Sequence, residues 1–169
     1  MFAEVSYANI TNCYNTSPLI VTTRDTDYMN YNYLSNLTGI RSVIAGGIAG
    51  RMEYTHITGC MNAGEVNIPY SNFGVGNALV GGIVAKVTIG DGSHAIYDLP
   101  PEKASTITSC YNIGKLTGTV VGGIMGNTGT DCYVSDCYNV GELVIDEDNP
   151  QIDHLAIFKD GIICKGSAT

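Results

Sequence analysis

The sequence predicts an all-β protein, a parallel β-solenoid of about four coils with loop insertions. Three observations carry this prediction. Two short phrases alternate along the chain, and their segments are rich in Val, Ile, Thr and Tyr and bounded by Gly, Asn or Asp. No stretch keeps the i, i+3, i+4, i+7 apolar spacing of a helix. Phrases that return at a regular interval indicate a repeat array.

The first phrase places an asparagine two residues after a cysteine. It occurs at 10–19, 57–66, 107–116 and 134–143, and its last two copies read ITSCYNIGKL and VSDCYNVGEL. Cys110 and Cys137 are 27 residues apart, an interval typical of solenoid repeats. Stacked coils of this kind place equivalent residues in ladders with a spacing of about 4.8 Å.

The second phrase is a pair of glycines followed by apolar residues. It occurs at 43–50, 79–85 and 120–126 and alternates strictly with the first phrase. Glycine weakens a strand, so glycine here indicates a close approach of two backbones or a tight bend where coils stack. The uneven spacing predicts loop insertions at Thr16–Ile40, Asn67–Asn77 and Thr88–Lys103.

The ladder geometry predicts which side chains point inward. We expect an inward apolar row, and we expect the cysteines of the first phrase to point inward as small hydrophobic residues. The asparagines of this phrase have two interpretations. They form either a corner, with the following glycine at positive φ, or an inward ladder of amides bonded from coil to coil. The apolar row is Ile10, Ile57, Ile107 and Val134 together with Val66, Leu116 and Leu143.

Residues 1–169 are expected to form a single repeat domain, a segment of a larger protein. Residues 146–169 lack both phrases in clean form, which predicts a degenerate last coil that caps the array. No apolar run approaches the roughly 20 residues that span a bilayer, so we expect no membrane insertion in this segment. No signal peptide pattern is visible at the N-terminus.

The glycine phrase also carries a resemblance to a known family. Gly47-Ile-Ala-Gly50 and Gly123-Ile-Met-Gly126, each followed by a cysteine phrase, resemble the GLUG repeat of bacterial cell-surface proteins. The middle copy, Gly82-Ile-Val-Ala85, lacks the final glycine. The resemblance covers Ile40 to Leu143. It implies a repeat region of secreted or wall-attached, adhesin-like bacterial proteins, an extracellular location at the cell surface, and no catalytic residues.

Composition and this resemblance together define the functional hypothesis. A net charge of −8 with only 8 Lys and Arg argues against nucleic acid as a partner. We expect a non-catalytic repeat domain that acts in adhesion or as a structural spacer presenting loops, without a cofactor. Its expected partners are neighbouring repeats of the parent chain and a host or cell-surface glycan or protein ligand.

The first insertion contains the candidate ligand-contact residues Tyr28, Tyr31, Tyr33 and Asn32. Aromatic rings and amides suit the binding of sugars or peptides, because rings stack on flat faces while amides bond to the rim. The alternative is that these tyrosines cover the flank or the open end of the solenoid.

A small carbohydrate-active β-helix or glycan-binding module is the alternative function. Such an enzyme needs clustered carboxylates, for which Asp131 and Asp136 are candidates, although solvated loop acids are the more economical interpretation. The sequence contains no CxxC and no HExxH, so we expect no metal site. We expect free thiols, with Cys132 and Cys164 as the best candidates for a disulfide if one forms.

Overall fold

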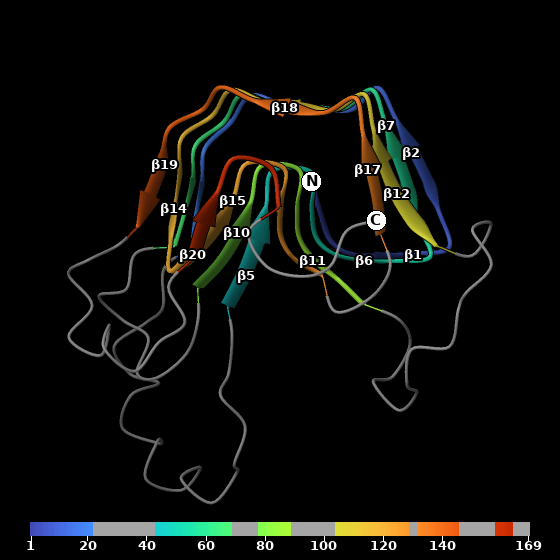
Figure 1. Cartoon of the computed structure of the whole chain (residues 1–169), viewed down its shortest axis with the longest axis horizontal. Coiled ribbons are helices and arrows are strands. Elements are labelled where there is room, and N and C mark those ends of the chain that lie inside the picture. The colour runs from blue at the N-terminus through green and yellow to red at the C-terminus, as the bar shows by residue number, and fades with distance from the viewer. Residues whose placement is uncertain (22–42, 69–77, 89–103, 129–131, 146–157, 164–169) are drawn as a thin grey trace, which may run out of the picture.

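The structure is a computed structural model that describes residues 1–21, 43–68, 78–88, 104–128, 132–145 and 158–163. Within these residues the regular elements are all strands, and every strand pairing is parallel. The strands form five four-stranded sheets that stack equivalent segments of successive coils (Figure 1). The prediction of a parallel β-solenoid is therefore confirmed.

Each coil passes through the five sheets in the same order, from sheet A to sheet E. Sheet A contains β1 (Phe2–Ser6), β6 (Ala49–Glu53), β11 (Val84–Val87) and β16 (Met125–Thr128). Sheet B contains β2 (Asn9–Thr11), β7 (His56–Thr58), β12 (Ser105–Thr108) and β17 (Cys132–Ser135). Sheet C contains β3 (Tyr14–Asn15), β8 (Met61–Asn62), β13 (Tyr111–Asn112) and β18 (Tyr138–Asn139).

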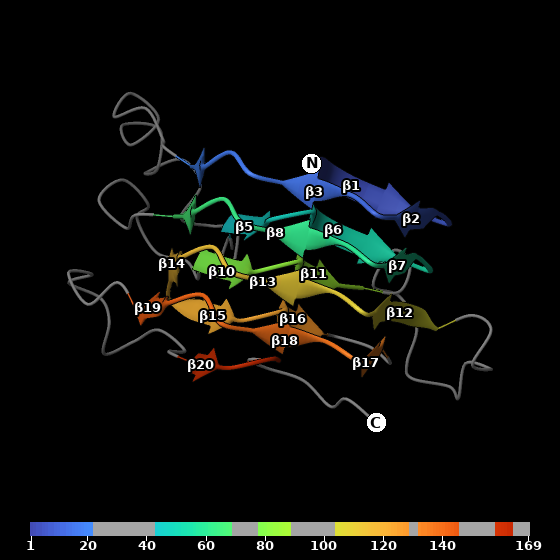
Figure 2. The same cartoon turned by 90° about the horizontal axis from the view of Figure 1, so that it is seen from above.

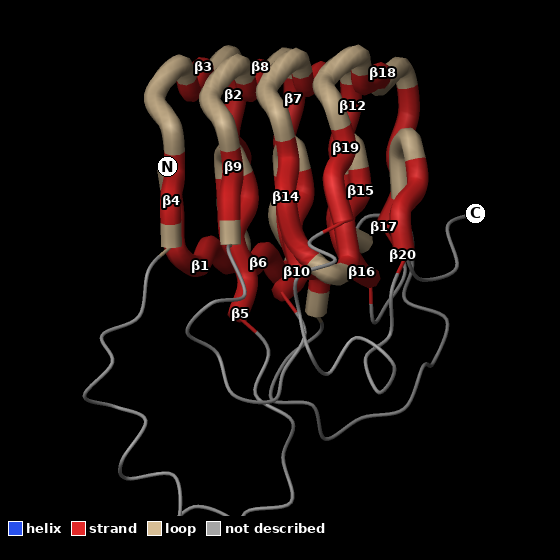
Figure 3. The backbone as a smooth tube through the Cα atoms, turned by 90° about the vertical axis from the view of Figure 1, so that its left-hand side faces the viewer, coloured by secondary structure: helices blue, strands red, loops and turns tan. Residues whose placement is uncertain are grey.

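The last two sheets of each coil follow sheet C. Sheet D contains β4 (Leu19–Ile20), β9 (Val66–Asn67), β14 (Leu116–Gly118) and β19 (Leu143–Ile145). Sheet E contains β5 (Val43–Gly46), β10 (Ala78–Gly81), β15 (Val120–Gly122) and β20 (Phe158–Asp160). Figures 2 and 3 show the coils side by side along the axis of the solenoid.

The cross-section is not a simple polygon. In Figure 1, sheet C forms the upper side, and sheets D and B descend from its left and right ends. Sheet E lies between them, on the inner side of sheet D. The turn from sheet E to sheet A, which contains the glycine pair, therefore reaches the inner side of sheet C. This path divides the interior into two apolar cores. One includes Ile57, Ile107 and Ile124, and the other includes Val66, Leu116 and Val121.

The strand register confirms the predicted inward apolar row. Ile10, Ile57, Ile107 and Val134 pair in sequence across sheet B. Sheet D brings Leu19 into line with the predicted row of Val66, Leu116 and Leu143. The side chains at the middle of each row are fully buried. Burial of apolar area at about 25 cal/mol per Å² is the main stabilising contribution of these rows.

Each of the four coils has a left-handed corner between sheets B and C, and Tyr7 and Tyr54 have positive φ between sheets A and B. At the corner between sheets B and C, one residue of each coil has a positive φ, with values of 53°, 64°, 53° and 52° at Asn12, Gly59, Ser109 and Asp136. Glycine and small polar residues adopt this left-handed conformation at the lowest cost. The corner interpretation of the asparagines in the cysteine phrase is wrong, since the left-handed residue comes three positions earlier.

The glycines that follow those asparagines have a different role from the predicted one. Gly64, Gly114 and Gly141 are absent from the residues with positive φ. A Cβ atom at each of them would collide with the backbone carbonyl of the preceding coil, namely that of Ser17, Gly64 or Gly114. These positions need glycine because neighbouring coils approach closely there.

The predicted insertion boundaries need correction. Leu19 and Ile20 form β4 and pair with Val66 and Asn67, so the first insertion does not begin at Thr16. Asn67 likewise belongs to sheet D, and the N–H of Thr88 donates to the carbonyl of Met52 at 3.0 Å. Residues 22–40, 69–77 and 89–103 of the three predicted insertions lie outside the described part of the chain, whereas Ile68 is described and buried.

Residues 158–163 add strand β20 beside β15. Asp160 and Gly161 take the places of Gly122 and Gly123 in this last coil, and Ile163 forms an isolated parallel bridge to Met125. None of the described residues forms a helix that is long and apolar enough to cross a membrane.

Candidate functional site: the outward face of sheet C

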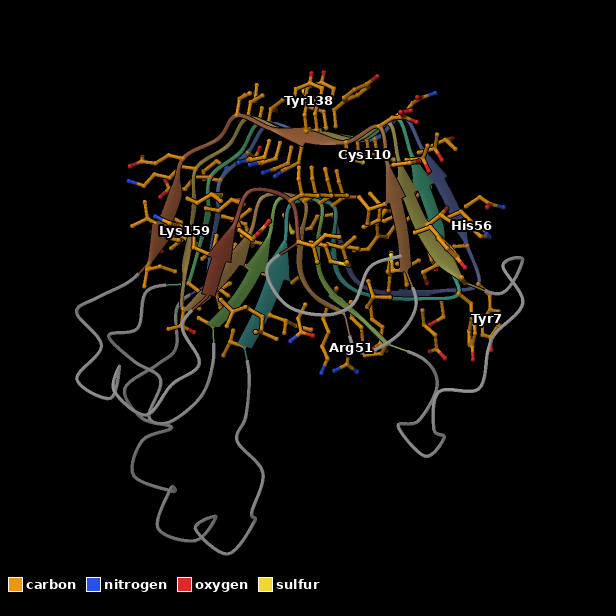
Figure 4. All side chains as sticks on the ribbon, in the orientation of Figure 1. Tyr7, Arg51, His56, Cys110, Tyr138 and Lys159 are labelled. Carbon is orange, nitrogen blue, oxygen red and sulfur yellow. The ribbon has the colours of Figure 1, made fainter. Side chains whose placement is uncertain are left out.

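Sheet C presents a row of large side chains to solvent. The register places Tyr14, Met61, Tyr111 and Tyr138 above one another. Tyr14 and Tyr138, at the two ends of the row, are 62% and 51% exposed. Figure 4 shows Tyr138 pointing away from the solenoid and Cys110 on the inner side.

The tyrosine rings stack along the ladder. The ring centroids of Tyr111 and Tyr138 are 5.0 Å apart and the rings are inclined by 5°. This distance matches the spacing of neighbouring parallel strands, which is about 4.8 Å. The two ring faces that Tyr111 and Tyr138 turn toward each other are covered, while the ring edges and hydroxyl groups remain open to a ligand on the outer side of the sheet.

A second outward row lies beside the tyrosines. Ala63, Ile113 and Val140 each follow the asparagine of their coil, and Ile113 and Val140 are 47% and 72% exposed. The two rows together form a surface without a charged side chain, which we call the uncharged strip. It consists of Tyr14, Met61, Ala63, Tyr111, Ile113, Tyr138 and Val140. Charge begins beyond its edge, where Lys115 and Glu142 form an exposed ion pair at 3.4 Å.

A ladder of asparagines supports the strip from inside. The amide Nδ2 atoms of Asn15, Asn62 and Asn112 donate to the Oδ1 atom of the asparagine one coil later at 2.8, 2.7 and 2.7 Å. Asn62 and Asn112 are fully buried and also donate to the carbonyls of Gly64 and Gly114, both at 2.9 Å. The interpretation of an inward amide ladder is confirmed. Because every interior amide is satisfied on both sides, the ladder holds sheet C in one register.

The glycine pairs lie against the inner side of this ladder. A Cβ atom at Gly82 would meet the carbonyl oxygen of Gly123 and the side chain of Asn112, and a Cβ at Gly123 would meet Asn139 in the same way. The predicted close approach of backbones at the glycine phrase is therefore confirmed. Asparagines and glycines of different phrases therefore occupy one layer, and the two phrases alternate because each coil contains one copy of each position.

A cysteine ladder runs beside the asparagine ladder. The backbone N–H groups of Cys13, Cys60 and Cys110 donate to the sulfur of the cysteine one coil later, at 3.3, 3.3 and 3.4 Å. Cys60 and Cys110 are fully buried, as the sequence predicted. Cys13, Cys60, Cys110, Cys132 and Cys137 are all free thiols, and Cys164 lies outside the described residues. The thiols thus serve as packing groups and weak acceptors.

We expect the buried thiol of Cys132 to make the domain sensitive to alkali. Burial, together with a smaller contribution from the charge of Cys137, raises the pKa of Cys132 to about 12. A raised pKa in the folded state means that this thiol stabilises the fold fully below the pKa of the unfolded chain, and that this contribution is lost as the pH rises toward 12. When the pH is raised from 7.5 to 10, the ionisation of this thiol in the unfolded chain should lower the unfolding free energy by about 1–2 kcal/mol.

Urea unfolding at both pH values measures this loss. The variant Cys132→Ala should show a smaller loss, because alanine does not titrate. An identical pH dependence in the two proteins would contradict the assignment of the effect to Cys132.

The structure places the other predicted site residues as follows. Tyr28, Tyr31, Tyr33, Asn32 and Asp131 lie outside the described residues. Asp136 is exposed at the left-handed corner between sheets B and C. Within the described ranges, no three His, Cys, Asp or Glu side chains come together as a metal site would require.

Sequence reasoning missed the uncharged strip, although its signal was present. Side chains alternate between the two faces of a strand, so the neighbours of an inward asparagine must point outward. These neighbours are Tyr, Met, Ile, Val or Ala in the last three copies of the cysteine phrase.

Neither the family models, nor the curated proteins, nor the solved structures contain a match to the chain. The resemblance to the GLUG repeat thus stays a prediction made from the residues.

Proposed function

We propose that the chain is a non-catalytic repeat domain of a bacterial surface or secreted protein, acting in adhesion or as a spacer that presents loops. The observation that supports this function is the uncharged strip on a rigid ladder. Contiguous exposed apolar side chains on a soluble protein mark interaction sites. Aromatic and aliphatic groups at the centre with charged groups at the rim are the usual anatomy of a binding surface.

The chemistry of the strip indicates the kind of ligand. The chain carries a net charge of −8, yet the strip contains no carboxylate and no cation. Binding there would depend on apolar contact and on hydrogen bonds from tyrosine hydroxyl groups, since ion pairs are excluded. These properties suit a neutral glycan or an uncharged protein patch better than an ionic ligand.

The interior ladders support the spacer role and the binding role alike. A binding surface built on strands with satisfied interior hydrogen bonds keeps its shape without a ligand, so little entropy is lost on binding. The flat rows repeat with the coil spacing, and further coils would extend the same surface along the axis.

Binding of the purified chain to arrays of neutral glycans and to immobilised surface proteins tests this function. Val140→Asp places a charge in the strip, and Thr58→Asp places the same charge on the outer side of sheet B as the matched control. Loss of a contact that contributes more than 1 kcal/mol weakens binding at least about fivefold, which is the result we expect for Val140→Asp. Equal binding by both variants, or release of shortened glycans, would contradict the proposal.

A further inference from the structure

The two ends of the solenoid carry complementary halves of the same backbone ladder. In sheet C the N–H groups of Met61, Tyr111 and Tyr138 donate to the carbonyls of Cys13, Cys60 and Cys110, at 3.0, 3.0 and 3.2 Å. The same register directs the N–H of Tyr14 out of the N-terminal end. It directs the carbonyl of Cys137 out of the opposite end. Neither group has a partner among the described residues.

The asparagine ladder ends in the same complementary way. Asn139 donates its Nδ2 to the carbonyl of Gly141 at 3.1 Å but has no further asparagine to bond, within the described ranges. At the other end the Oδ1 of Asn15 accepts the N–H of Ser17 at 3.2 Å and receives no amide from a preceding coil. A donor at one end therefore matches an acceptor at the other. Two N-terminal ends brought together would instead oppose the N–H donors of two Tyr14 residues and the Oδ1 acceptors of two Asn15 side chains.

One position in sheet A prevents a second copy of the chain from stacking on the C-terminal end of the solenoid. Phe2, Ala49, Val84 and Met125 follow one another in register along this sheet. Ile163 bridges to Met125 and occupies the next place. A second copy that continued sheets B, C and D in register would bring its own Phe2 to this same place. The two segments exclude each other.

Asp160 holds Ile162 and Ile163 in this position. In the internal coils, the two N–H groups that follow the glycine pair bond to an isoleucine carbonyl of the next coil, as those of Ile124 and Met125 bond to Ile162, both at 2.9 Å. In the last coil the N–H groups of Ile162 and Ile163 bond instead to Oδ1 of Asp160, at 2.9 and 3.2 Å. The carboxylate replaces the carbonyl of a following coil.

We propose that Asp160–Ile163 is a cap that blocks head-to-tail stacking of a second copy of this chain on a self-complementary solenoid end. The N-terminal coil of one copy fits the C-terminal edges of sheets B, C and D of another, and it binds once Ile163 leaves the rung that Phe2 requires. A head-to-tail contact of this kind does not close on itself, so it produces a series of oligomers.

Sedimentation velocity and light scattering over a range of protein concentrations test this proposal. The wild-type chain should be monomeric. Asp160→Ala removes the acceptor of two N–H groups and should strengthen self-association by on the order of tenfold. Asp160→Asn keeps an acceptor oxygen at the same atom and should remain monomeric. Circular dichroism shows whether each variant keeps its strands.

Two further variants test the same contact from the other end. A chain shortened by Met1 and Phe2 removes the competing residue and leaves Asp160 intact, so it should also associate. Tyr14→Pro removes the outward N–H at a place where an edge strand tolerates proline, and it should restore the monomer in both backgrounds. The proposal is wrong if neither uncapped chain associates, if association survives Tyr14→Pro, or if a single closed dimer forms.

Discussion

Replacing Gly123 by alanine should destabilise the domain by about 3 kcal/mol or more, the upper range for overpacking. A Cβ atom there would meet the carbonyl oxygen of Gly161 and would lie 2.6 Å from the Cβ of Asn139. The first of these neighbours is backbone, so the contact can be relieved only by separating coils. Chemical unfolding followed by circular dichroism measures the effect.

Gly161→Ala is the matched control, because Gly161 occupies the same place one coil later. A Cβ atom at Gly161 has nothing within 4 Å. Its expected effect is neutral or stabilising by up to about 1 kcal/mol, since alanine restricts the unfolded chain. Similar losses in both variants would show that the close approach of the glycine turns is not what makes glycine necessary.

Asn112→Leu should cost about 2–6 kcal/mol and leave the fold marginal. The leucine keeps the approximate volume of asparagine but removes three hydrogen bonds of a fully buried amide. It leaves one of the two N–H groups of the Asn62 amide and the carbonyl of Gly114 without their partner, and each unsatisfied buried group costs about 1–3 kcal/mol. Thermal unfolding and chemical unfolding both report this loss.

The control for the asparagine ladder is Asn15→Leu at its open end. Asn15 is only partly buried and makes one ladder bond, to Asn62 at 2.8 Å. Water can replace the bond to the exposed N–H of Ser17, and the buried Oδ1 of Asn62 is the one group that loses its donor, so we expect a loss of about 1–3 kcal/mol, smaller than that of Asn112→Leu. If the end and the middle of the ladder respond equally, the ladder does not contribute through burial of its amides.

These two predictions concern the support of the proposed binding surface. The strip is flat because each coil repeats the same path, and that path is set by the layer of glycine and asparagine beneath it. A variant that loosens this layer should also weaken the binding of any ligand to the strip. Variants on the outer surface should change binding and leave stability unchanged.

The fold class and the inward rows could be predicted from the sequence because a solenoid translates one pattern along its axis. The spacing of Cys110 and Cys137 requires equivalent residues to stack, and apolar rows must then face inward. The glycine phrase likewise predicted a close approach. Four copies of the cysteine phrase and three copies of the glycine phrase made these inferences independent of any single residue.

The corner and the strip were harder to recognise. The left-handed position is occupied by Asn12, Gly59, Ser109 and Asp136 in turn, so no single residue type marks it. The predicted loop of Tyr28, Tyr31, Tyr33 and Asn32 drew attention because it is rich in tyrosine, whereas the strip contributes one or two residues from each coil. A surface assembled from distant segments has no local signal in the chain.

The tertiary structure alone decided which residues meet across the coil. The periodicity specifies what lies above and below a residue, since that is a translation along the axis. It does not specify how the path bends within one coil, and only that bend brings Gly82 against Asn112. The role of the Asp160 carboxylate was likewise decided only by the tertiary structure. That role depends on two N–H groups that meet no following coil among the described residues, and this situation is defined only once the coils are stacked.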